Sequence, residues 1–524
     1  MCIRDRIGMK KYLGAELFFE SLYELGIRTI FGLPGGYVLK IYDVMPSYAK
    51  KINHILTRHE QAATHMADGF SRASGLPGII LCTSGPAATN TVTGISTAYV
   101  DSVPVLIFTG QVPTPFLGSD AFQEADHIGI TRSTTKHNTL VRKTKDLPKA
   151  IAEALHISNT GRKGPVLVDM PKDVLLGESE FKIPKKVNLP NYTEEPRVTA
   201  RVMKNFKDKF LNSKKPIFIF GKGSCYQENV PNILKIIKKF NIPSLTSLLS
   251  LGLVHSEISF GMIGSSGSYA SSKLIEESDH IISVGCDINK ILPKSTFLKK
   301  NMTIVDIDQT QLDPKNKMNL NINSSSINFL EYIVKEIDSY KSQWSKDFLQ
   351  KMREMNIKAQ KEEISKNNKA FIYKKLSDIL GDKVVICSDF SYDDVNNQQY
   401  FKFNDYRNSV LAGGNGTPGY GFPAAIGAKF SRPGSKVVSI SSGTNFQFNM
   451  QEMIVALEQN LDLTIIVLNE KYLKKGLKYK GPDYKILAES FGAKAYQLNF
   501  DSKIETNLTK TLKLKGLILI EIRI

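Results

Sequence analysis

The sequence predicts an α/β protein made of three doubly wound domains with mainly parallel sheets. Strand-like and helix-like segments alternate along almost the whole chain, which is the pattern of βαβ units. The strand segments are continuous apolar runs, as expected for strands that helices cover on both faces. At 524 residues the chain is also longer than one hydrophobic core can organise.

The first domain is predicted at residues 9–181. Its strand signals are "TIFGLPGG", "PGIILCTSGPAATN", "SVPVLIFTG" and "GPVLVDMP", and the first two run directly into glycine turns. Ligands of doubly wound sheets bind at the carboxyl ends of the strands, so these turns indicate a site. The proline-rich, polar segment Lys182–Pro196 predicts a linker.

Two further domains are predicted at 197–340 and 371–524. The first of these has the strand signals "KPIFIFG", "IPSLTS", "HIISVG" and "MTIVDID", and the second has "KVVICSD", "KVVSISSG", "DLTIIVLNE" and "KGLILIEIRI". Between them, the charged segment Tyr340–Ala370 predicts a bridging helix that includes Trp344, the only tryptophan.

Composition excludes several classes of protein. The net charge is +18, but the lysines alternate with acidic residues along the chain, so we expect solvated helix faces and no nucleic-acid partner. No apolar run is long enough to span a membrane, and the start, "MCIRDRIG", is not a signal peptide. Five scattered cysteines favour a cytoplasmic protein without a zinc site. We interpret Met1–Gly8 as an extension before a first helix that opens at Met9.

Four long segments resemble one family. They are "FGLPGG", "RHEQAATHMADGFSRASG", "TSGPAATNTVTGISTAYVDSVPVLIFTGQVP" and "DAFQEADHIGITRSTTKHN". The chain is similar, from Met9 onward, to the thiamine-diphosphate enzymes and in particular to the catalytic subunit of acetolactate synthase. The resemblance implies the cofactor thiamine diphosphate.

Glu60, in "RHEQ", matches the family's activating glutamate. A carboxyl group that hydrogen-bonds the N1′ atom of the cofactor's pyrimidine helps that ring to act as a base. To share a proton with so weak a base, the carboxyl should lie in an apolar pocket. By the same resemblance, the pyrimidine is lined by Gly35, Pro86, Asn90, Gly416 and Thr417.

Four further residues match positions near the reacting carbon and the substrate anion in this family: Gln111, Phe122, Gln123 and Lys136. A lysine that faces the carboxylate of a 2-oxo acid supplies charge complementarity and orientation. Phe122 is alternatively a plain core residue.

The match breaks in the third domain, where the family holds the diphosphate and a metal. The family's loop, approximately GDGSFQMN, aligns with Ser442–Asn449, so that Gly443 stands at the metal-binding aspartate, followed by Thr444 and Asn445. The next metal position falls on Glu470, and Tyr472 would offer a backbone carbonyl. The methionine that bends the cofactor falls on Pro418.

These departures leave two interpretations open. In the first, the carboxylate has moved from position 443 to Glu470, and Asn445 or water completes a Mg²⁺ site. In the second, the metal is lost. Asp393 and Asp394, which fall on the family's phosphate contacts, favour loss because they would repel a diphosphate.

The resemblance also implies FAD in the central domain. "SFGMIGSSGSYAS" and "VDID" resemble its contacts, whereas "VGCDINKI" lacks the arginine and the paired aspartates of the family's segment. The FAD site is therefore left open by the sequence.

We expect a thiamine-diphosphate-dependent 2-oxo acid carboligase of the acetolactate synthase type, acting on pyruvate in branched-chain amino-acid biosynthesis. A simple 2-oxo acid decarboxylase is an alternative. A second alternative is a cofactor-impaired homologue that acts as a binding or structural subunit. The family implies a homodimer or tetramer with sites between chains, and an impaired chain could form a heteromer with an intact homologue.

Overall fold

The computed structural model describes residues 10–255, 258–293, 300–313, 319–389, 396–470, 472–473, 477–478 and 480–524. The chain divides into two compact units. Unit 1 comprises Met1–Tyr192, Pro423–Arg432 and Asn449–Leu461, and unit 2 comprises Thr193–Phe422, Pro433–Phe448 and Asp462–Ile524. The three large sheets are wholly parallel, which confirms the predicted fold class. The predicted domain limits at 9–181, 197–340 and 371–524 stay predictions, as does the extension at Met1–Gly8, which lies outside the described residues.

Unit 1 contains a six-stranded sheet in the order β3-β2-β4-β5-β7-β6. Its strands are β2 (Thr29–Gly32), β3 (Asn53–Leu56), β4 (Gly78–Cys82), β5 (Val105–Gln111), β6 (His137–Leu140) and β7 (Val166–Pro171). Every residue of β4, β5 and β7 is buried. These segments are mainly apolar because a strand covered on both faces has no solvent side.

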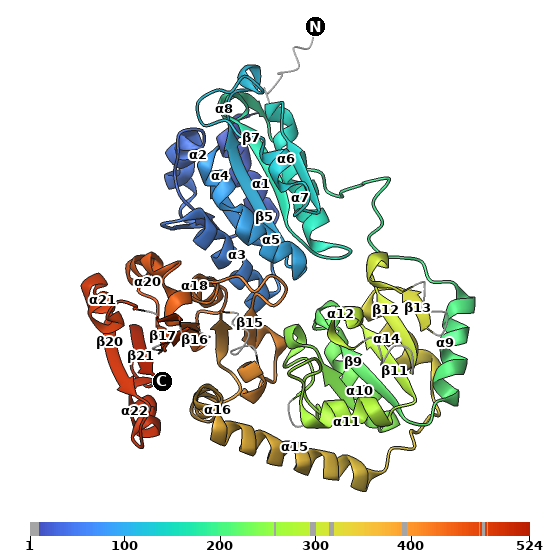
Figure 1. Ribbon diagram of the computed structural model, residues 1–524. Coiled ribbons are helices and arrows are strands. Elements are labelled where there is room, and N and C mark those ends of the chain that lie inside the picture. Colours follow the sequence, from blue (N-terminus) through green and yellow to red (C-terminus); the bar gives the residue numbers. More distant parts are fainter. Residues whose placement is uncertain are drawn as a thin grey trace. The chain divides into compact units, whose positions relative to one another are not determined.

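Helices lie on both faces of this sheet (Figure 1). Those within the first 192 residues are α1 (Gly14–Glu24), α2 (Leu39–Val44), α3 (Glu60–Ser74), α4 (Pro86–Asn90), α5 (Val92–Val100), α6 (His127–Thr131), α7 (Leu147–Asn159) and α8 (Lys172–Leu176). A short antiparallel pair joins β1 (Lys11–Leu13) to β8 (Glu178–Glu180). The segment 182–196 that follows has neither helix nor strand, as predicted for a linker.

The strand order of unit 1 defines a switch point. The chain leaves β2 for β3 on one side and then crosses to β4 on the other side of β2. In open α/β sheets the ligand binds where the strand order reverses, outside the carboxyl ends of the strands. The turns after β2 and β4 therefore lie at the place where this fold forms a crevice.

Unit 2 contains the other two large sheets. The five-stranded sheet has the order β10-β9-β11-β12-β13. Its strands are β9 (Pro216–Phe220), β10 (Ser244–Thr246), β11 (His280–Val284), β12 (Asn301–Asp306) and β13 (Asn319–Asn323). Its helices are α9 (Ala200–Asn212), α10 (Asn229–Phe240), α11 (Tyr269–Glu277), α12 (Ile288–Ile291) and α14 (Ser326–Glu336).

The second six-stranded sheet has the order β15-β14-β16-β17-β21-β20. Its strands are β14 (Val385–Ser388), β15 (Ser409–Leu411), β16 (Val437–Ser442), β17 (Leu463–Asn469), β20 (Lys494–Asn499) and β21 (Leu517–Arg523). Its helices are α16 (Asn368–Leu380), α19 (Gly443–Phe446), α21 (Tyr484–Phe491) and α22 (Ile504–Thr511), and β18 (Tyr472–Leu473) pairs with β19 (Leu477–Lys478). Two helices of the same part of the sequence, α18 (Gly421–Ser431) and α20 (Met453–Glu458), contribute segments to unit 1.

The predicted bridging helix is corrected in two respects. The helix α15 spans Lys346–Lys366 and a separate helix, α16, begins at Asn368. The side chain of Ser345 caps the N-terminus of α15, and the side chain of Asn367 caps the N-terminus of α16. Local hydrogen bonds therefore fix where each helix begins. Trp344 precedes the helix, is buried, and donates its indole N–H to the carbonyl of Pro216 at 2.7 Å; it is a core residue.

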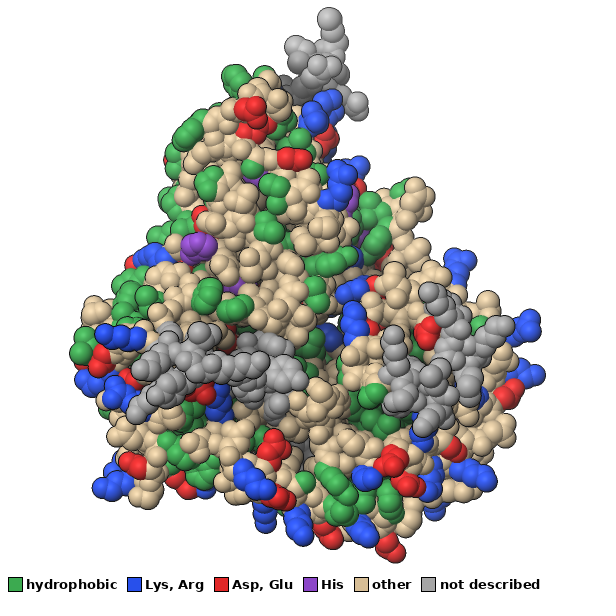
Figure 2. Space-filling model, in the orientation of Figure 1, with side chains coloured by type: hydrophobic (Ala, Val, Ile, Leu, Met, Phe, Trp, Pro, Cys, Tyr) green, Lys and Arg blue, Asp and Glu red, His purple; other side chains and the backbone are tan. Residues whose placement is uncertain are grey.

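Charged side chains of both signs are mixed over the visible face of the molecule (Figure 2). Many pair at helical spacing, such as Lys366 with Glu362 and Lys485 with Glu489. Within the described ranges, no helix has the length and apolarity that crossing a bilayer requires.

Candidate functional site

The turn after β2 approaches the turn after β4 closely at the switch point. A Cβ atom on Gly35 would lie 2.3 Å from Cγ2 of Thr83, so only glycine fits there. The hydroxyl of Thr83 accepts the backbone N–H of Tyr37 at 3.1 Å, which ties the two turns together. The backbone at Gly35 is therefore held at the crevice, with the side chain of Thr83 filling the space that a side chain at position 35 would need.

Glu60 is the first residue of α3 and lies at the carboxyl edge of the same sheet. The residue is half-buried, and its Oε2 atom accepts a hydrogen bond of 2.9 Å from the amide of Asn90. Among the described residues, the other oxygen, Oε1, accepts no hydrogen bond. The carboxylate is thus oriented by one contact and retains an oxygen for a ligand.

Pro86 and Asn90 begin and end the short helix α4 and are both exposed. Gly85 precedes them with φ +62°, a conformation that glycine adopts without strain. Its backbone N–H donates to Nε2 of His127 at 3.1 Å. The structure therefore brings Gly35, Glu60, Pro86 and Asn90 to one edge of one sheet.

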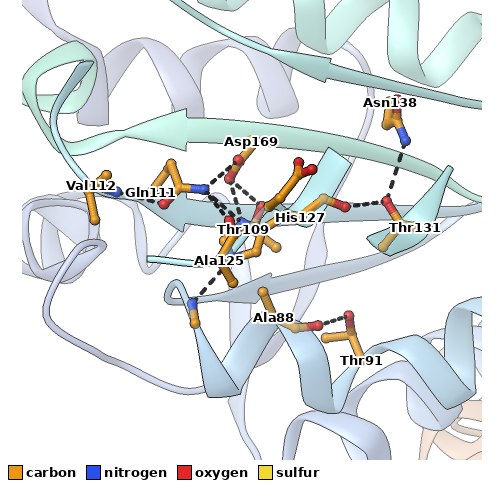
Figure 3. A network of polar contacts seen from close by, with 12 residues as sticks. Ala88, Thr91, Thr109, Gln111, Val112, Ala125, His127, Thr131, Asn138 and Asp169 are labelled. Carbon is orange, nitrogen blue, oxygen red and sulfur yellow. Dashed lines mark hydrogen bonds and ion pairs between the residues drawn. The ribbon is translucent and has the colours of Figure 1, made fainter. Parts of the chain in front are cut away.

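Gln111, the last residue of β5, is the centre of a buried polar network (Figure 3). Its amide donates to Oδ2 of Asp169 at 3.0 Å and to the carbonyl of Ala125 at 2.9 Å. Asp169 also accepts the hydroxyl of Thr109 at 2.7 Å. Gln111 is only 3% exposed, and these contacts fix the orientation of its amide; its role near the reacting carbon stays a prediction.

His127 connects this network to the turn after β4. Its Nε2 accepts the N–H of Gly85, so the proton of a neutral ring lies on Nδ1, which faces Oδ1 of Asp169 at 3.0 Å. The sequence did not single out His127 or Asp169. Both are buried, and their contacts hold Gln111 and Gly85 in fixed positions.

Phe122 and Gln123 lie in the loop that follows β5. The ring of Phe122 is 81% exposed, which excludes the plain core residue of the alternative interpretation within the single chain. Gln123 has φ +61°, and its Oε1 atom would lie 3.7 Å from a Cβ on Gly36. Both residues thus belong to the edge that carries Glu60, although their roles stay predictions.

Lys136 lies at the opposite edge of the sheet. It immediately precedes β6, and its backbone N–H pairs with the carbonyl of Pro165, before β7 begins. Its ammonium donates to the carbonyl of Thr160 at 2.7 Å and to the hydroxyl of Tyr192 at 3.0 Å. At about 3.3 Å per residue, the length of a strand separates it from Gln111. Within one chain the structure does not bring Lys136 to the edge that carries Glu60, and its predicted role at a substrate anion stays a prediction.

Lys172 is a cation that the sequence reasoning missed. It is exposed, follows β7 directly, and β7 ends at Pro171, which is paired with Gln111. Its ammonium lies 5.9 Å from the ring centre of Tyr37, the residue tied to Thr83. The signal was available, because a lysine directly after a buried strand lies at the carboxyl edge.

The remaining predicted cofactor contacts belong to unit 2. Gly416 has φ +61°, Thr417 is buried and Pro418 is exposed. They occupy the segment between β15 and α18, which again follows the carboxyl end of a strand.

Gly443 opens α19 directly after β16. Its carbonyl accepts the hydroxyl of Tyr484 at 2.7 Å and the amide of Gln447 at 3.2 Å. Thr444 and Asn445 are half-buried. The hydroxyl oxygen of Ser442 lies 3.1 Å from the hydroxyl oxygen of Thr444 and accepts the backbone N–H of Asn445 at 3.3 Å.

Glu470 follows β17 at the same edge, because Ser442 of β16 is paired with Leu468 of β17. Its carboxylate forms an ion pair of 3.1 Å with Lys369, whose side chain is 11% exposed. Tyr472 begins β18. The predicted phosphate contacts Asp393 and Asp394 lie outside the described residues.

The two halves of the predicted site differ in how well they fit the cofactor. The unit 1 residues fit a pyrimidine ring: a glycine turn without side chains, and a carboxylate with an unused oxygen beside an exposed amide. The unit 2 residues do not fit a metal bound at position 443. Tyr484 lies where that side chain would extend, and Glu470 is paired with a lysine. Among the described residues, no cluster of three metal-binding side chains occurs.

In the central sheet, the segment 259–271 is folded by contacts within itself, and Gly285 of "VGCDINKI" lies close to Gly221 after β9. A Cβ on Gly221 would lie 2.3 Å from the carbonyl of Gly285, and one on Gly261 would lie 2.4 Å from the hydroxyl of Ser268. Ser268 and Ser271 bond to the carbonyls of Phe260 and Met262. These glycines allow close internal packing, and we assign no step to FAD.

Three family models match the chain in order. They are the N-terminal TPP binding domain of thiamine pyrophosphate enzymes at residues 13–130, the central domain at 204–333, and the C-terminal TPP binding domain at 394–522.

Curated relatives match nearly the whole chain. The acetolactate synthase large subunit of Lactococcus lactis is 34% identical over 93% of this chain and 88% of its own length. The acetolactate synthase isozyme 3 large subunit of Escherichia coli is 31% identical over 96% of this chain and 93% of its own length. The mitochondrial acetolactate synthase catalytic subunit of Saccharomyces cerevisiae is 32% identical over 98% of this chain and 80% of its own length.

Proposed function

Because the chain belongs to the acetolactate synthase large-subunit family of thiamine pyrophosphate enzymes, we propose that it is a thiamine-diphosphate-dependent 2-oxo acid carboligase. The reaction would be the decarboxylation of pyruvate and condensation with a second 2-oxo acid, as in branched-chain amino-acid biosynthesis. The observation that carries this proposal is the Glu60–Asn90 pair at the switch point, beside the turn at Gly35.

When bound, thiamine diphosphate supplies a carbon that accepts the electrons released as a 2-oxo acid loses CO₂. Glu60 would hold a proton between its Oε1 atom and the pyrimidine, while Asn90 fixes the carboxylate through Oε2. Gly35 lets the flat ring approach the backbone. Lys172, which follows β7 at the edge that carries Glu60, is a further candidate beside Lys136 for orienting the carboxylate of the substrate.

The experiment is a calorimetric titration of the full chain with thiamine diphosphate, followed by measurement of acetolactate formed from pyruvate. We expect Glu60→Gln to reduce product formation by two orders of magnitude or more, about the contribution of one acid–base group. Glu24→Gln, an exposed glutamate at the end of α1, is the matched control and should behave as wild type. Free acetaldehyde as the main product would instead identify a decarboxylase, and equal activity of Glu60→Gln would refute the assignment of this residue.

A second candidate function follows from the geometry at Gly443. We propose as the alternative that the diphosphate half of the site is degenerate and that this chain supplies Glu60 to the site of an intact homologue. The contact of Tyr484 with Gly443 and the Lys369–Glu470 ion pair support it.

Complementation tests this alternative. An acetolactate synthase large subunit whose own activating glutamate is replaced should regain activity on mixing with wild-type chain but not with the Glu60→Gln variant. Full activity of this chain alone, with no gain on mixing, would remove the alternative.

A further inference from the structure

Tyr484 occupies the space that a side chain at position 443 would need. It is the first residue of α21 and is fully buried. A Cβ atom built on Gly443 would lie 2.7 Å from its hydroxyl oxygen and 3.2 Å from each of two ring carbons. These separations are shorter than the contact distance between carbon atoms of about 3.5 Å, so an aspartate at 443 requires the tyrosine ring to move.

The tyrosine is not free to move. Its hydroxyl donates to the carbonyl of Gly443 at 2.7 Å and accepts the amide of Gln447 at 3.1 Å, and Gln447 donates to the same carbonyl at 3.2 Å. The ring packs edge-on to Phe446, with 6.1 Å between ring centres, and Phe446 in turn packs on Phe422. A closed triangle of hydrogen bonds and an edge-on aromatic contact therefore hold Tyr484 against the loop.

At the other predicted metal position, the carboxylate of Glu470 is paired with a lysine of the same chain. Lys369 lies in the first turn of α16, and its ammonium is 3.1 Å from Oε1 of Glu470. With the lysine side chain 11% exposed, the attraction is screened less than that of a surface pair. A divalent cation at Glu470 would have to compete with this ammonium, because both need the same carboxylate oxygens.

We propose that Tyr484 and the Lys369–Glu470 ion pair replace a divalent cation at the carboxyl edge of this sheet, and that the site is closed to Mg²⁺ and Mn²⁺. The hydroxyl stands in the place of a metal-binding carboxylate, and the ammonium supplies the positive charge. This inference goes beyond the proposed function, since it holds whether or not the chain turns over a 2-oxo acid.

The test uses Mn²⁺ as the probe, because the free ion is counted directly by electron paramagnetic resonance. The full wild-type chain, with and without thiamine diphosphate, is expected to bind no stoichiometric Mn²⁺. Gly443→Asp combined with Tyr484→Ala, which restores the carboxylate and removes the obstructing ring, should bind one Mn²⁺ at least about tenfold more tightly than wild type. Gly443→Asp alone should lower the unfolding midpoint without gaining Mn²⁺.

Two results would overturn the inference. The first is one equivalent of Mn²⁺ on the wild-type chain that is lost in Glu470→Gln. The second is a double variant that is folded by circular dichroism and still binds no Mn²⁺. If the double variant does not fold, the test rests on the Mn²⁺ titrations of the wild-type chain and of Glu470→Gln. Tyr484→Phe, which keeps the ring but not the hydroxyl, serves as the control and should bind no Mn²⁺.

Discussion

Both carboxylate oxygens of Glu452 lie 3.2 Å from the backbone nitrogen of Arg58 and accept its N–H, although the two residues are 394 positions apart in the sequence. Arg58 is two residues before Glu60, so this contact holds the entry to the helix that carries the candidate catalytic carboxylate. The guanidinium of Arg58 also pairs with Glu458. The segment that contains Glu452 and Glu458 therefore helps to position Glu60 by holding Arg58.

The first prediction concerns the pH dependence of stability. Burial raises the pKa of Glu452 from 4.5 to about 7, against the opposing hydrogen bond from Arg58. A raised carboxyl pKa means that the folded state binds the proton more tightly. The stabilising contribution is complete below pH 4.5 and is lost as the pH rises through 7, an effect of about 3 kcal/mol.

Glu452→Gln should remove this part of the pH dependence. Urea denaturation at a series of pH values between 4.5 and 8 measures it as a flatter unfolding free energy. Glu458→Gln, which removes the more exposed partner of Arg58, should retain the wild-type slope. Identical slopes for wild type and Glu452→Gln would contradict the burial of an ionisable carboxyl at this position.

The second prediction concerns the network around Gln111. Asp169→Asn replaces an acceptor-only carboxylate by an amide that cannot accept from Thr109, Gln111 and His127 together. Removing one partner from a buried polar network leaves donors unpaired, at a cost of about 2–4 kcal/mol.

The unfolding free energy in urea measures this cost. Asp146→Asn, an exposed aspartate in the same domain, should change it by less than about 0.5 kcal/mol. A similarly small change for Asp169→Asn would show that the carboxylate is not the centre of the network.

The sequence predicted the parts of this site that follow from local pattern. The glycine turn at Gly35 comes directly after a strand signal, whereas Glu60 was identified by the family resemblance, and parallel strands bring both positions to one edge. The contacts of Gln111 with Asp169, 58 residues later, and of Gly443 with Tyr484, 41 residues later, depend on packing that no local pattern encodes. For Lys136, the resemblance suggested a role but not its place in the sheet, and the strand register puts it before β6, away from the carboxyl edge of this chain.

The third prediction separates two lysines. Lys172 lies at the carboxyl edge with Glu60, so Lys172→Met should raise KM for pyruvate roughly tenfold while kcat changes less, as expected when a ground-state contact is lost. Lys136→Met should raise KM by a smaller factor, because its ammonium is bound to carbonyl groups at the other edge. Steady-state kinetics of both variants show which lysine orients the substrate. A larger effect on KM from Lys136→Met would favour Lys136 as the residue that faces the carboxylate.

The fourth prediction is that Lys136 affects stability at alkaline pH. Burial, with a contribution from the Arg162 guanidinium, lowers the pKa of Lys136 from 10.5 to about 8. The unfolded state therefore holds the proton more tightly, and the stability of the folded state rises as the pH increases from 8 to 10.5, by about 2–3 kcal/mol. Lys136→Met should abolish this rise in denaturation experiments, whereas replacement of Lys40, a lysine on α2 whose side chain is 33% exposed, by methionine should preserve it.

The last prediction uses the exposure of Phe122. A ring that is 81% exposed contributes little to folding, so Phe122→Ala should change the unfolding free energy by less than about 0.5 kcal/mol. The neighbouring backbone is fixed, because the carbonyl of Phe122 accepts the hydroxyl of Tyr37 at 2.8 Å. A large aromatic ring presented on a fixed loop at the carboxyl edge is suited to contact a ligand or a second chain. We therefore expect the affinity for thiamine diphosphate or pyruvate to fall severalfold in calorimetry and kinetics while the thermal midpoint stays unchanged. Loss of stability without loss of affinity would show that the ring is buried in the assembled protein and serves packing alone.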